Sequence, residues 1–419
     1  MRKSSGDTDQ IQENEGSIQL GRRRLMTMAG AGLAAAPLFG AMSSASAQTP
    51  GGTSETNTNI GESTIGNGPY LTEGMAAYSK TGLHRPMKLN RRALGPKDVA
   101  VQIHYCGICH SDIHTIHEDW GKTGFPLITG HEVAGVVVAT GSSVSKHRLG
   151  DRVGVGPMVN SCRHCGECES DLEQYCEGLI TSYGSKDLDG TITQGGYSRL
   201  MVVDEDFVLK IPSAMDLAQA GPLLCAGVTV YSPLRRWSIG PGQKVGVIGF
   251  GGLGHIAVKL ADALGAEVTV FTTSPEKVAD AKHMGGKEVV VYKDNADLSK
   301  YKRTFHFILD TAPYAHNLDM FIDTLKRDGT LCRVGVGKLT TPNEAGQMTI
   351  VTTRKNLAGS MLGSVRETQE LLDFCATRNI YPEVTKIPMN NIDAAWANVI
   401  AKKARYRYVI DFTSPKTTV

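Results

Sequence analysis

Residues 244–254 read KVGVIGFGGLG, a short apolar run that passes directly into glycines. The run predicts a buried strand, and the residues from about 253 to 264 predict a helix. Gly249 permits a tight turn, Gly251 lets a pyrophosphate approach the backbone, and Gly254 allows the helix and strand to pack closely. A strand, a glycine turn and a helix in this order predict a dinucleotide-binding unit with phosphate at the helix N-terminus. The candidate cofactor-binding residues of the turn are Gly249, Gly251, Gly252, Leu253 and Gly254.

A strand–helix alternation continues from this unit to about residue 360 and defines a cofactor domain over residues 226–362. Apolar runs predict further strands at 267–272, 288–292 and 305–310, with helical runs such as 275–284 between them. Alternating strands and helices are typical of a doubly wound parallel sheet, so the predicted fold class is α/β.

The segments on either side of the cofactor domain have a different character. Residues 69–225 contain short strands and glycine-punctuated loops, which predicts a β-rich domain with candidate metal ligands in long loops. Residues 363–419 are expected to return to that domain. The elements predicted here are strands at 99–104, 132–139, 384–388 and 407–412 and a helix at 367–378.

Four cysteines lie close together in the β-rich segment: Cys162, Cys165, Cys168 and Cys176. Four thiolates at this spacing can enclose zinc in a tetrahedral cage with no open position, as structural zinc sites do. The alternative is a loop of reduced or disulfide-paired cysteines. A zinc ribbon in a nucleic-acid-binding module would carry the same cage. The cage therefore predicts a metal and says little about chemistry.

A second set of candidate ligands lies on either side of the cage. Cys109 stands in Gly-Ile-Cys-His-Ser-Asp, His131 in Gly-His-Glu, and Cys225 in Leu-Cys-Ala-Gly. Two thiolates and one imidazole leave a fourth position for water or a substrate oxygen, which is the pattern of a catalytic zinc. Spacing alone leaves this assignment open, because a single Cys or His is more often an ordinary core residue.

Together and in this order, the motifs resemble those of zinc-dependent medium-chain alcohol dehydrogenases, and most closely the cinnamyl-alcohol-dehydrogenase-like NADP(H) branch. The resemblance runs from about residue 70 to the C-terminus. It implies a GroES-like catalytic domain beside a Rossmann domain, two zinc ions per chain, and a homodimer formed through the cofactor domains. The implied ligands of the catalytic zinc are Cys109, His131 and Cys225, with Glu132 beside the metal.

The same resemblance assigns the remaining cysteines. It implies that the four clustered cysteines bind the structural zinc. Cys106, Cys332 and Cys375 match no ligand and are expected to be ordinary small buried residues.

The end of the second strand of the cofactor domain bears on cofactor choice. NAD enzymes usually place Asp or Glu there to bind the ribose hydroxyls, but residues 268–275 contain no acid. Thr272, Thr273 and Lys277 instead offer hydroxyls and an ammonium group to a 2′-phosphate, and by resemblance they occupy the NADP-selecting region. The alternative is that Lys277 is a solvated helix lysine beside Glu276, but NADP(H) is the predicted cofactor.

The resemblance implies an oxidoreductase that interconverts alcohols and aldehydes by hydride transfer to or from the nicotinamide, with zinc acting on the substrate oxygen. Ser111 matches the position whose hydroxyl contacts that oxygen. His114 matches the histidine that relays the proton toward solvent, and Asp119 is a candidate to orient it. Without the resemblance, His114 and Asp119 would as readily be surface polar residues.

The substrate pocket is expected between Trp120 and the region of Met361 and Leu362. Thr181 stands where plant lignin-forming relatives carry a large aromatic residue, which predicts a pocket of different shape. A broad-range aldehyde reductase is the predicted activity. The alternatives are an NAD-dependent secondary-alcohol or polyol dehydrogenase and a zinc-bearing binding protein without activity.

Composition and net charge limit the classes of binding partner to be expected. The chain is 41% hydrophobic and 21% charged, as in soluble globular proteins, and its formal charge of +2 gives no reason to expect nucleic acid or an acidic membrane surface. The expected partner is a small alcohol or aldehyde.

The first 47 residues form a separate unit of the sequence. Arg22, Arg23 and Arg24 precede a weakly apolar stretch at 29–42, and Ala45-Ser-Ala47 offers a small-residue cleavage site. This order predicts a twin-arginine export signal over residues 1–47 without a membrane anchor, and hence a periplasmic enzyme. A basic extension on a cytoplasmic enzyme is the alternative. Residues 48–68 are rich in Thr, Gly, Asn and Ser and are predicted to be a flexible linker.

Overall fold

The computed structural model describes residues 66–414, except Gly82, Asp294 and residues 340–346. The predicted export signal at 1–47 and almost all of the predicted linker at 48–68 therefore lie outside the described residues. Within the described part, no helix is long and apolar enough to cross a membrane.

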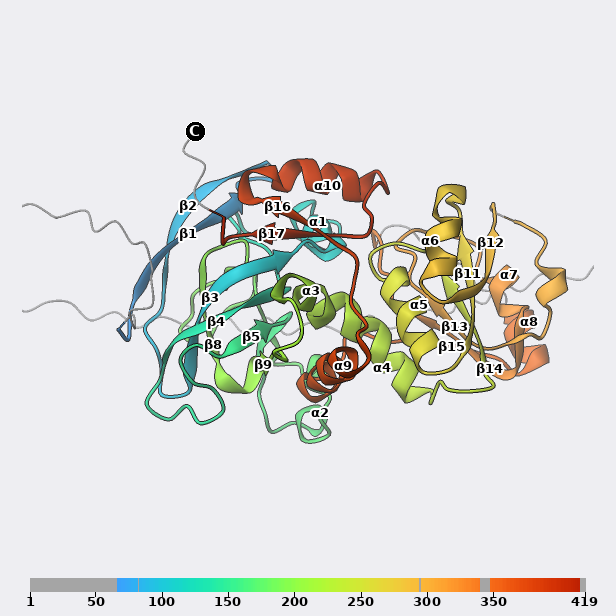
Figure 1. Cartoon of the computed structure of the whole chain (residues 1–419), viewed down its shortest axis with the longest axis horizontal. Helices are drawn as coiled ribbons and strands as arrows, with labels where there is room; N and C mark the ends of the chain where they lie inside the picture. Colours follow the sequence, from blue (N-terminus) through green and yellow to red (C-terminus); the bar gives the residue numbers. More distant parts are fainter. Residues whose placement is uncertain (1–65, 82, 294, 340–346, 415–419) are drawn as a thin grey trace, which may run out of the picture. The chain divides into compact units, whose positions relative to one another are not determined.

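The cofactor domain is built on a parallel sheet with the strand order β12-β11-β10-β13-β14-β15. The order reverses beside β10, which lies between β11 and β13, so the sheet has the predicted doubly wound topology (Figure 1). Its strands are β10 (Lys244–Ile248), β11 (Glu267–Thr272), β12 (Gly286–Val291), β13 (Phe305–Asp310), β14 (Leu325–Arg333) and β15 (Asn356–Gly359). Its helices are α4 (Val228–Arg236), α5 (Gly254–Ala263), α6 (Val278–His283), α7 (Asp319–Ile322) and α8 (Gln347–Thr353).

Helices cover both faces of this sheet. Alternate residues of β10 enter different cores: Val245 and Val247 pack with α5, whereas Ile248 packs with Phe321 of α7. Figure 1 shows α5 and α6 on one side of the strands and α7 and α8 on the other. Because both faces are buried, the strands read as apolar runs rather than as an alternating pattern. The predicted helical run at 275–284 is divided into a short 3₁₀ turn, Pro275–Lys277, and α6.

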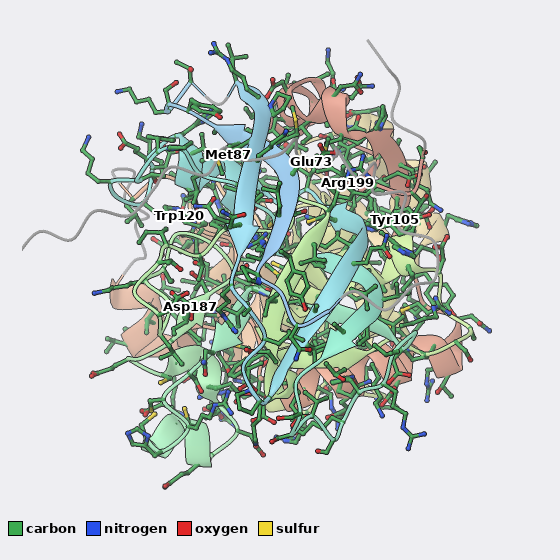
Figure 2. All side chains as sticks on the ribbon, turned by 90° about the vertical axis from the view of Figure 1, so that its left-hand side faces the viewer. Glu73, Met87, Tyr105, Trp120, Asp187 and Arg199 are labelled. Atoms are coloured by element: carbon green, nitrogen blue, oxygen red, sulfur yellow. The ribbon has the colours of Figure 1, made fainter. Side chains whose placement is uncertain are left out.

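The catalytic domain is centred on a seven-stranded sheet with the strand order β16-β17-β3-β4-β5-β9, in which β8 also pairs with β3. Its elements before the cofactor domain are β1 (Tyr70–Ala77), β2 (His84–Arg91), β3 (Asp98–Gly107), α1 (His110–Ile116), β4 (Val133–Thr140), β5 (Arg152–Val155), β6 (Met158–Asn160), α2 (Gly166–Glu169), β7 (Ile180–Thr181), β8 (Leu200–Asp204), β9 (Val208–Lys210) and α3 (Leu217–Pro222), with 3₁₀ turns at Glu173–Tyr175 and Glu205–Phe207. Figure 2 looks onto the β1–β2 hairpin of this domain, where Glu73 of β1 forms an ion pair with Arg199 at 2.9 Å.

The C-terminal segment joins the catalytic sheet. It consists of α9 (Val365–Arg378), β16 (Val384–Pro388), α10 (Ile392–Ile400) and β17 (Arg407–Asp411). β17 pairs antiparallel with β3, whereas β16 pairs parallel with β17. β17, the last strand among the described residues, thus lies beside the strand that leads into the Gly-Ile-Cys-His-Ser-Asp motif.

Candidate active site

The three candidate ligands of the catalytic zinc come together although they are distant in the sequence. Cys109 is the residue before α1, His131 lies just before β4, and Cys225 lies in a π-helical turn, Leu223–Gly227, between α3 and α4. The Sγ atoms of Cys109 and Cys225 are 4.0 Å apart, and His131 Nε2 is 3.2 Å from Cys225 Sγ. All three residues are buried and line the same cavity.

This donor set fits zinc. Two sulfurs on a tetrahedral zinc ion are about 3.8 Å apart, given Zn–S bonds of about 2.3 Å. The pKa of the Cys109 thiol lies well below its ordinary value because Cys109 accepts a hydrogen bond from Cys225, so the pair offers a thiolate to a cation. Since all three donors line the cavity, a ligand in the cavity could complete the coordination.

Glu132, expected beside the metal, lies next to the three donors and also forms an ion pair with an arginine. Its donor atom lies within 4.8 Å of the other three, but its carboxylate accepts a hydrogen bond from Arg407 Nη2 of β17. Burial raises the pKa of Glu132, and the Arg407 guanidinium opposes that rise. A Cβ atom at position 107 would lie 2.0 Å from Glu132 Oε2, so only glycine leaves room for this carboxylate. Glu132 and Arg407 thus form a buried ion pair behind the three zinc donors.

Asp112 contacts both of the loops that carry Cys109 and His131. This fully buried carboxylate accepts hydrogen bonds from the Cys109 amide at 2.9 Å, the Gly130 amide at 3.0 Å and the Tyr197 hydroxyl at 2.9 Å. Its Oδ1 also lies 3.1 Å from Nδ1 of His131. The contact directs Nε2 of His131 toward the thiols, which is the usual orientation of a zinc-binding histidine.

The cavity extends from the zinc donors to the glycine turn and has a volume of about 1180 Å³. Gly249 has φ +88°, and a Cβ at Gly254 would lie 2.1 Å from the Gly249 carbonyl oxygen, so both positions require glycine. Gly251 faces open space, as close approach of a phosphate requires. No Asp or Glu is among the described residues that line the cavity, whereas Lys277 and Arg407 are, and this charge pattern suits a polyanionic ligand.

The corner expected to receive a 2′-phosphate lies in the same cavity. Thr272, Thr273 and Lys277 all line it. Lys277 is only 5% exposed, donates from Nζ to the Phe250 carbonyl at 3.2 Å, and lies 5.7 Å from the centre of the Tyr406 ring. The alternative of a solvated helix lysine is therefore wrong. Lys277 is thus a buried ammonium group beside the glycine turn.

Comparison with known proteins agrees with this geometry. The family models described as "Alcohol dehydrogenase GroES-like domain" and "Zinc-binding dehydrogenase" match residues 95–213 and 252–377. The chain is 47% identical over 345 residues to "NADP-dependent alcohol dehydrogenase C 1" of Mycolicibacterium smegmatis, covering 81% of this chain and 98% of that relative. This chain belongs to the zinc-binding alcohol dehydrogenases.

Two further relatives support membership of this alcohol dehydrogenase family. "Aldehyde reductase YahK" of Escherichia coli is 45% identical over 342 residues, covering 81% of this chain and 97% of that protein. The crystal structure of CAD from Helicobacter pylori complexed with NADP(H) is 40% identical with a TM-score of 0.78, covering 81% of this chain and 98% of that chain. The predicted combination of a GroES-like and a Rossmann domain is therefore confirmed.

Of the residues expected to relay a proton in this alcohol dehydrogenase, Ser111 and His114 line the cavity, and Asp119 contacts His114 from outside the lining. Ser111 Oγ lies 3.5 Å from Cys109 Sγ, and His114 Nδ1 lies 2.9 Å from Asp119 Oδ2. Burial opposes ionisation of Asp119, but hydrogen bonds from His114 and Lys338 hold its pKa below the ordinary value. His114 Nε2 is buried, and no described residue hydrogen-bonds to it, so this nitrogen is available to a bound ligand.

The four-cysteine cage lies away from this cavity. The donor atoms of Cys162, Cys165, Cys168 and Cys176 lie within 4.8 Å of one another, and none of the four residues lines the cavity. The Sγ atoms of Cys162 and Cys168 are 3.9 Å apart, and those of Cys165 and Cys168 are 3.5 Å apart, so the cage also fits a tetrahedral zinc ion. Three further cysteines, Cys106, Cys332 and Cys375, are fully buried.

Three residues of the site, Asp112, Arg407 and Tyr406, were not expected from the sequence. Asp112 stands within the quoted motif, and its spacing of three residues from Cys109 could have indicated a second role. Arg407 is the first residue of β17 and Tyr406 directly precedes it. Neither residue could be found from the sequence, because nothing local links them to zinc or to the glycine turn. Trp120, Met361 and Leu362 line the cavity as expected, and the rings of Trp120 and His114 stack with their centres 5.0 Å apart.

Proposed function

We propose that this enzyme interconverts primary alcohols and aldehydes with NADP(H) and acts mainly as a broad-range aldehyde reductase. One observation carries the proposal: Cys109, His131 and Cys225 line the same cavity as the glycine turn and the buried Lys277. The names of the relatives from M. smegmatis and E. coli and the NADP(H) complex of the H. pylori protein support it.

Zinc held by Cys109, His131 and Cys225 would supply Lewis-acid polarisation of a substrate oxygen, and the nicotinamide would supply or accept the hydride. The chain's own residues would transfer the proton. Ser111 presents a hydroxyl beside Cys109, where it can hydrogen-bond to the substrate oxygen and pass its proton. His114 would take up that proton at Nε2 in alcohol oxidation and return it toward the substrate oxygen in aldehyde reduction, while Asp119 orients the ring through Nδ1.

Lys277 and its neighbours support NADP(H) over NAD(H). A buried ammonium group without an acidic partner in the cavity lining favours an additional phosphate. The hydroxyls of Thr272 and Thr273 line the same corner. An acid that would bind ribose hydroxyls and repel the phosphate is absent from residues 268–275.

The activity is tested with a panel of aldehydes, ketones and polyols, each assayed with NADPH and NADH in parallel. We expect the highest kcat/KM for aldehydes with NADPH. Preferential oxidation of secondary alcohols or polyols with NAD would contradict the proposal and favour the alternative dehydrogenase. Zinc content separates both enzymes from a binding protein: about two ions per chain are expected, and Cys109→Ser should retain about one and lose activity.

We further propose a homodimer formed through the cofactor domains. β15 is one of the two edge strands of the parallel sheet, and Leu357 in this strand is 43% exposed. An exposed edge strand offers unpaired backbone groups to a second copy of the chain. Light scattering after size-exclusion chromatography tests the mass, and Leu357→Lys should shift a dimer toward the monomer. A monomeric wild-type enzyme would refute this arrangement.

We also propose twin-arginine export to the periplasm. The ground is the sequence of three features along the chain: Arg22–Arg24, then the apolar stretch, then Ala45–Ala47. Export after folding would protect the zinc-binding thiols from an oxidising compartment. Cell fractionation with N-terminal sequencing tests this proposal. A mature chain that begins near Gln48 in the periplasm is expected, whereas an uncut chain in the cytoplasm would reject export.

A further inference from the structure

The lobe formed by residues 162–176 carries a zinc cage but has no part in the chemistry described so far. We propose that this lobe is a positioning element for the active-site wall: Tyr175 and Glu173 hold the segment at residues 361–365, and thereby fix Met361 and Leu362 in the cavity. The inference concerns the same cavity and rests on the proposed function for its kinetic readout alone.

Two side chains of the lobe accept hydrogen bonds from the backbone of this segment. The Tyr175 hydroxyl oxygen accepts from the Met361 amide at 3.2 Å, and Glu173 Oε1 accepts from the Val365 amide at 2.9 Å. Figure 1 shows α2 of the lobe below α9, and the 3₁₀ turn Glu173–Tyr175 that follows α2 makes these contacts. A third contact, between Asp171 and Arg366 at 2.9 Å, joins two exposed side chains and is screened by solvent.

The segment that receives these contacts forms part of the cavity wall. Ser360, Met361 and Leu362 all line the cavity. Leu362 has φ +54°, a left-handed conformation that a non-glycine residue keeps only where its surroundings hold it. Upstream, the Ser360 amide donates to the Arg333 carbonyl at 3.1 Å. The lobe adds one contact on each side of Leu362, at the Met361 and Val365 amides.

Downstream, the segment enters a well-capped helix. Ser364 caps α9 and exchanges hydrogen bonds with Glu367 in a capping box. A Cβ atom at Gly363 would lie 2.5 Å from Val228 Cγ2, so the backbone packs tightly there. The Met361 amide, before this cap, and the Val365 amide, directly after it, both donate their hydrogen bonds to the lobe.

The lobe depends on its cage for its own shape. α2 contains no buried residue, and the Cys162, Cys165 and Cys168 side chains are only half-buried, so the lobe has little apolar core. Tyr175 directly precedes the ligand Cys176. On the opposite side, Arg163 forms ion pairs with Asp204 at 2.8 Å and Asp206 at 2.6 Å, at the end of β8. The cage therefore links the catalytic sheet to the wall of the cavity.

Tyr175→Phe tests the inference because it removes the hydroxyl and keeps the ring. We expect hydrogen exchange at the Met361 amide to become about three- to tenfold faster, the effect of losing one hydrogen bond. KM for NADPH or aldehyde should rise by a similar factor, while kcat and the zinc content stay within about twofold, because the zinc donors and the relay are untouched. Tyr78→Phe, at an exposed tyrosine that does not line the cavity, is the matched control.

Glu173 gives a second, graded test. Glu173→Gln keeps an acceptor oxygen for the Val365 amide and should preserve slow exchange there, whereas Glu173→Ala should accelerate it. Unchanged exchange at Met361 in Tyr175→Phe and at Val365 in Glu173→Ala would overturn the proposal, as would faster exchange with no change in either KM.

The cage itself is tested with Cys165→Ser, which should lower zinc to about one ion per chain and accelerate exchange at both amides. If that variant retains slow exchange, the cage does not hold the wall. If Cys165→Ser fails to fold, the Tyr175 and Glu173 variants alone test whether the lobe holds the segment at residues 361–365. The exchange measurements need no substrate, so they separate failure of this inference from failure of the proposed NADP(H)-dependent activity.

Discussion

His255 Nε2 accepts a hydrogen bond from the Glu383 backbone amide at 3.2 Å, and this bond ties the helix that follows the glycine turn to the returning C-terminal segment. The other ring nitrogen, Nδ1, donates to the Gly251 carbonyl at 3.0 Å. One nitrogen must accept and the other must donate, so the buried ring is neutral. Burial lowers the pKa of His255 from 6.5 to about 3.

This lowered pKa predicts acid sensitivity. Between about pH 6.5 and pH 3 the unfolded chain binds a proton at this site that the folded chain does not. The free energy of unfolding therefore falls as the pH falls below about 6.5, by up to about 1.4 kcal/mol per pH unit. Urea unfolding at pH 7 and pH 5 should show a smaller loss in His255→Gln than in the wild type. His283→Gln, at an exposed histidine, should match the wild type, and identical losses in all three proteins would contradict the prediction.

Asp112 supports the catalytic zinc through His131. Asp112→Asn should weaken zinc binding at that site or lower kcat/KM by about 10- to 100-fold, because an amide cannot accept all four of the contacts that the carboxylate makes. Tyr197→Phe removes one of these contacts and should have the smaller effect. Zinc titration with a competing chelator measures the change, and equal effects of the two variants would refute a specific role for Asp112.

Lys277 should discriminate between the two nicotinamide cofactors. Lys277→Ala is expected to raise KM for NADPH by about 10- to 100-fold, the effect of losing a charge-assisted hydrogen bond, and to change KM for NADH by less than about threefold. Lys282→Ala, at an exposed lysine of α6, is the control. A similar rise in both KM values would mean that Lys277 supports the glycine turn rather than a phosphate.

Thr181 should set the room available to the substrate. Its hydroxyl donates to the Tyr183 carbonyl at 2.9 Å and lies 2.6 Å from Ser185 Oγ, at the cavity wall. Thr181→Trp is expected to raise KM for bulky aromatic aldehydes several-fold more than for short aliphatic ones, because a larger side chain fills the pocket. Thr181→Val keeps the size and loses only the hydroxyl. If Thr181→Val and Thr181→Trp raise KM equally for the same substrates, the hydrogen bonds of Thr181 rather than its volume determine selectivity.

His114 should carry the proton relay. His114→Gln is expected to lower kcat by about 100-fold or more, because glutamine cannot take up and release the proton. Asp119→Asn should have a smaller effect, since it changes the orientation of the ring and leaves the ring in place. Steady-state kinetics across pH 6–9 measures both variants. Wild-type kcat in His114→Gln would exclude the relay.

Features encoded within a few consecutive residues could be read from the sequence alone. The turn at 249–254 is one, because its glycines are required by local backbone geometry and by close packing on the adjoining strand. β11 and β13 have the bounds predicted for them, since an apolar strand buried on both faces is recorded in its own composition. The four clustered cysteines are another, because a chain this short between ligands leaves little freedom in how they meet.

Only the tertiary structure decided which distant residues meet. Cys109 and Cys225 are brought together by β3 and a π-helical turn, and Arg407 reaches Glu132 because β17 pairs with β3. Lys277 packs over the ring of Tyr406, the residue directly before β17. No local pattern predicts these pairs, because they form through sheet pairing and domain packing rather than through spacing along the chain. The sequence by itself determined the glycine turn and the metal cage, and the packing of the two domains decided how the open zinc site and the cofactor corner come to share one cavity.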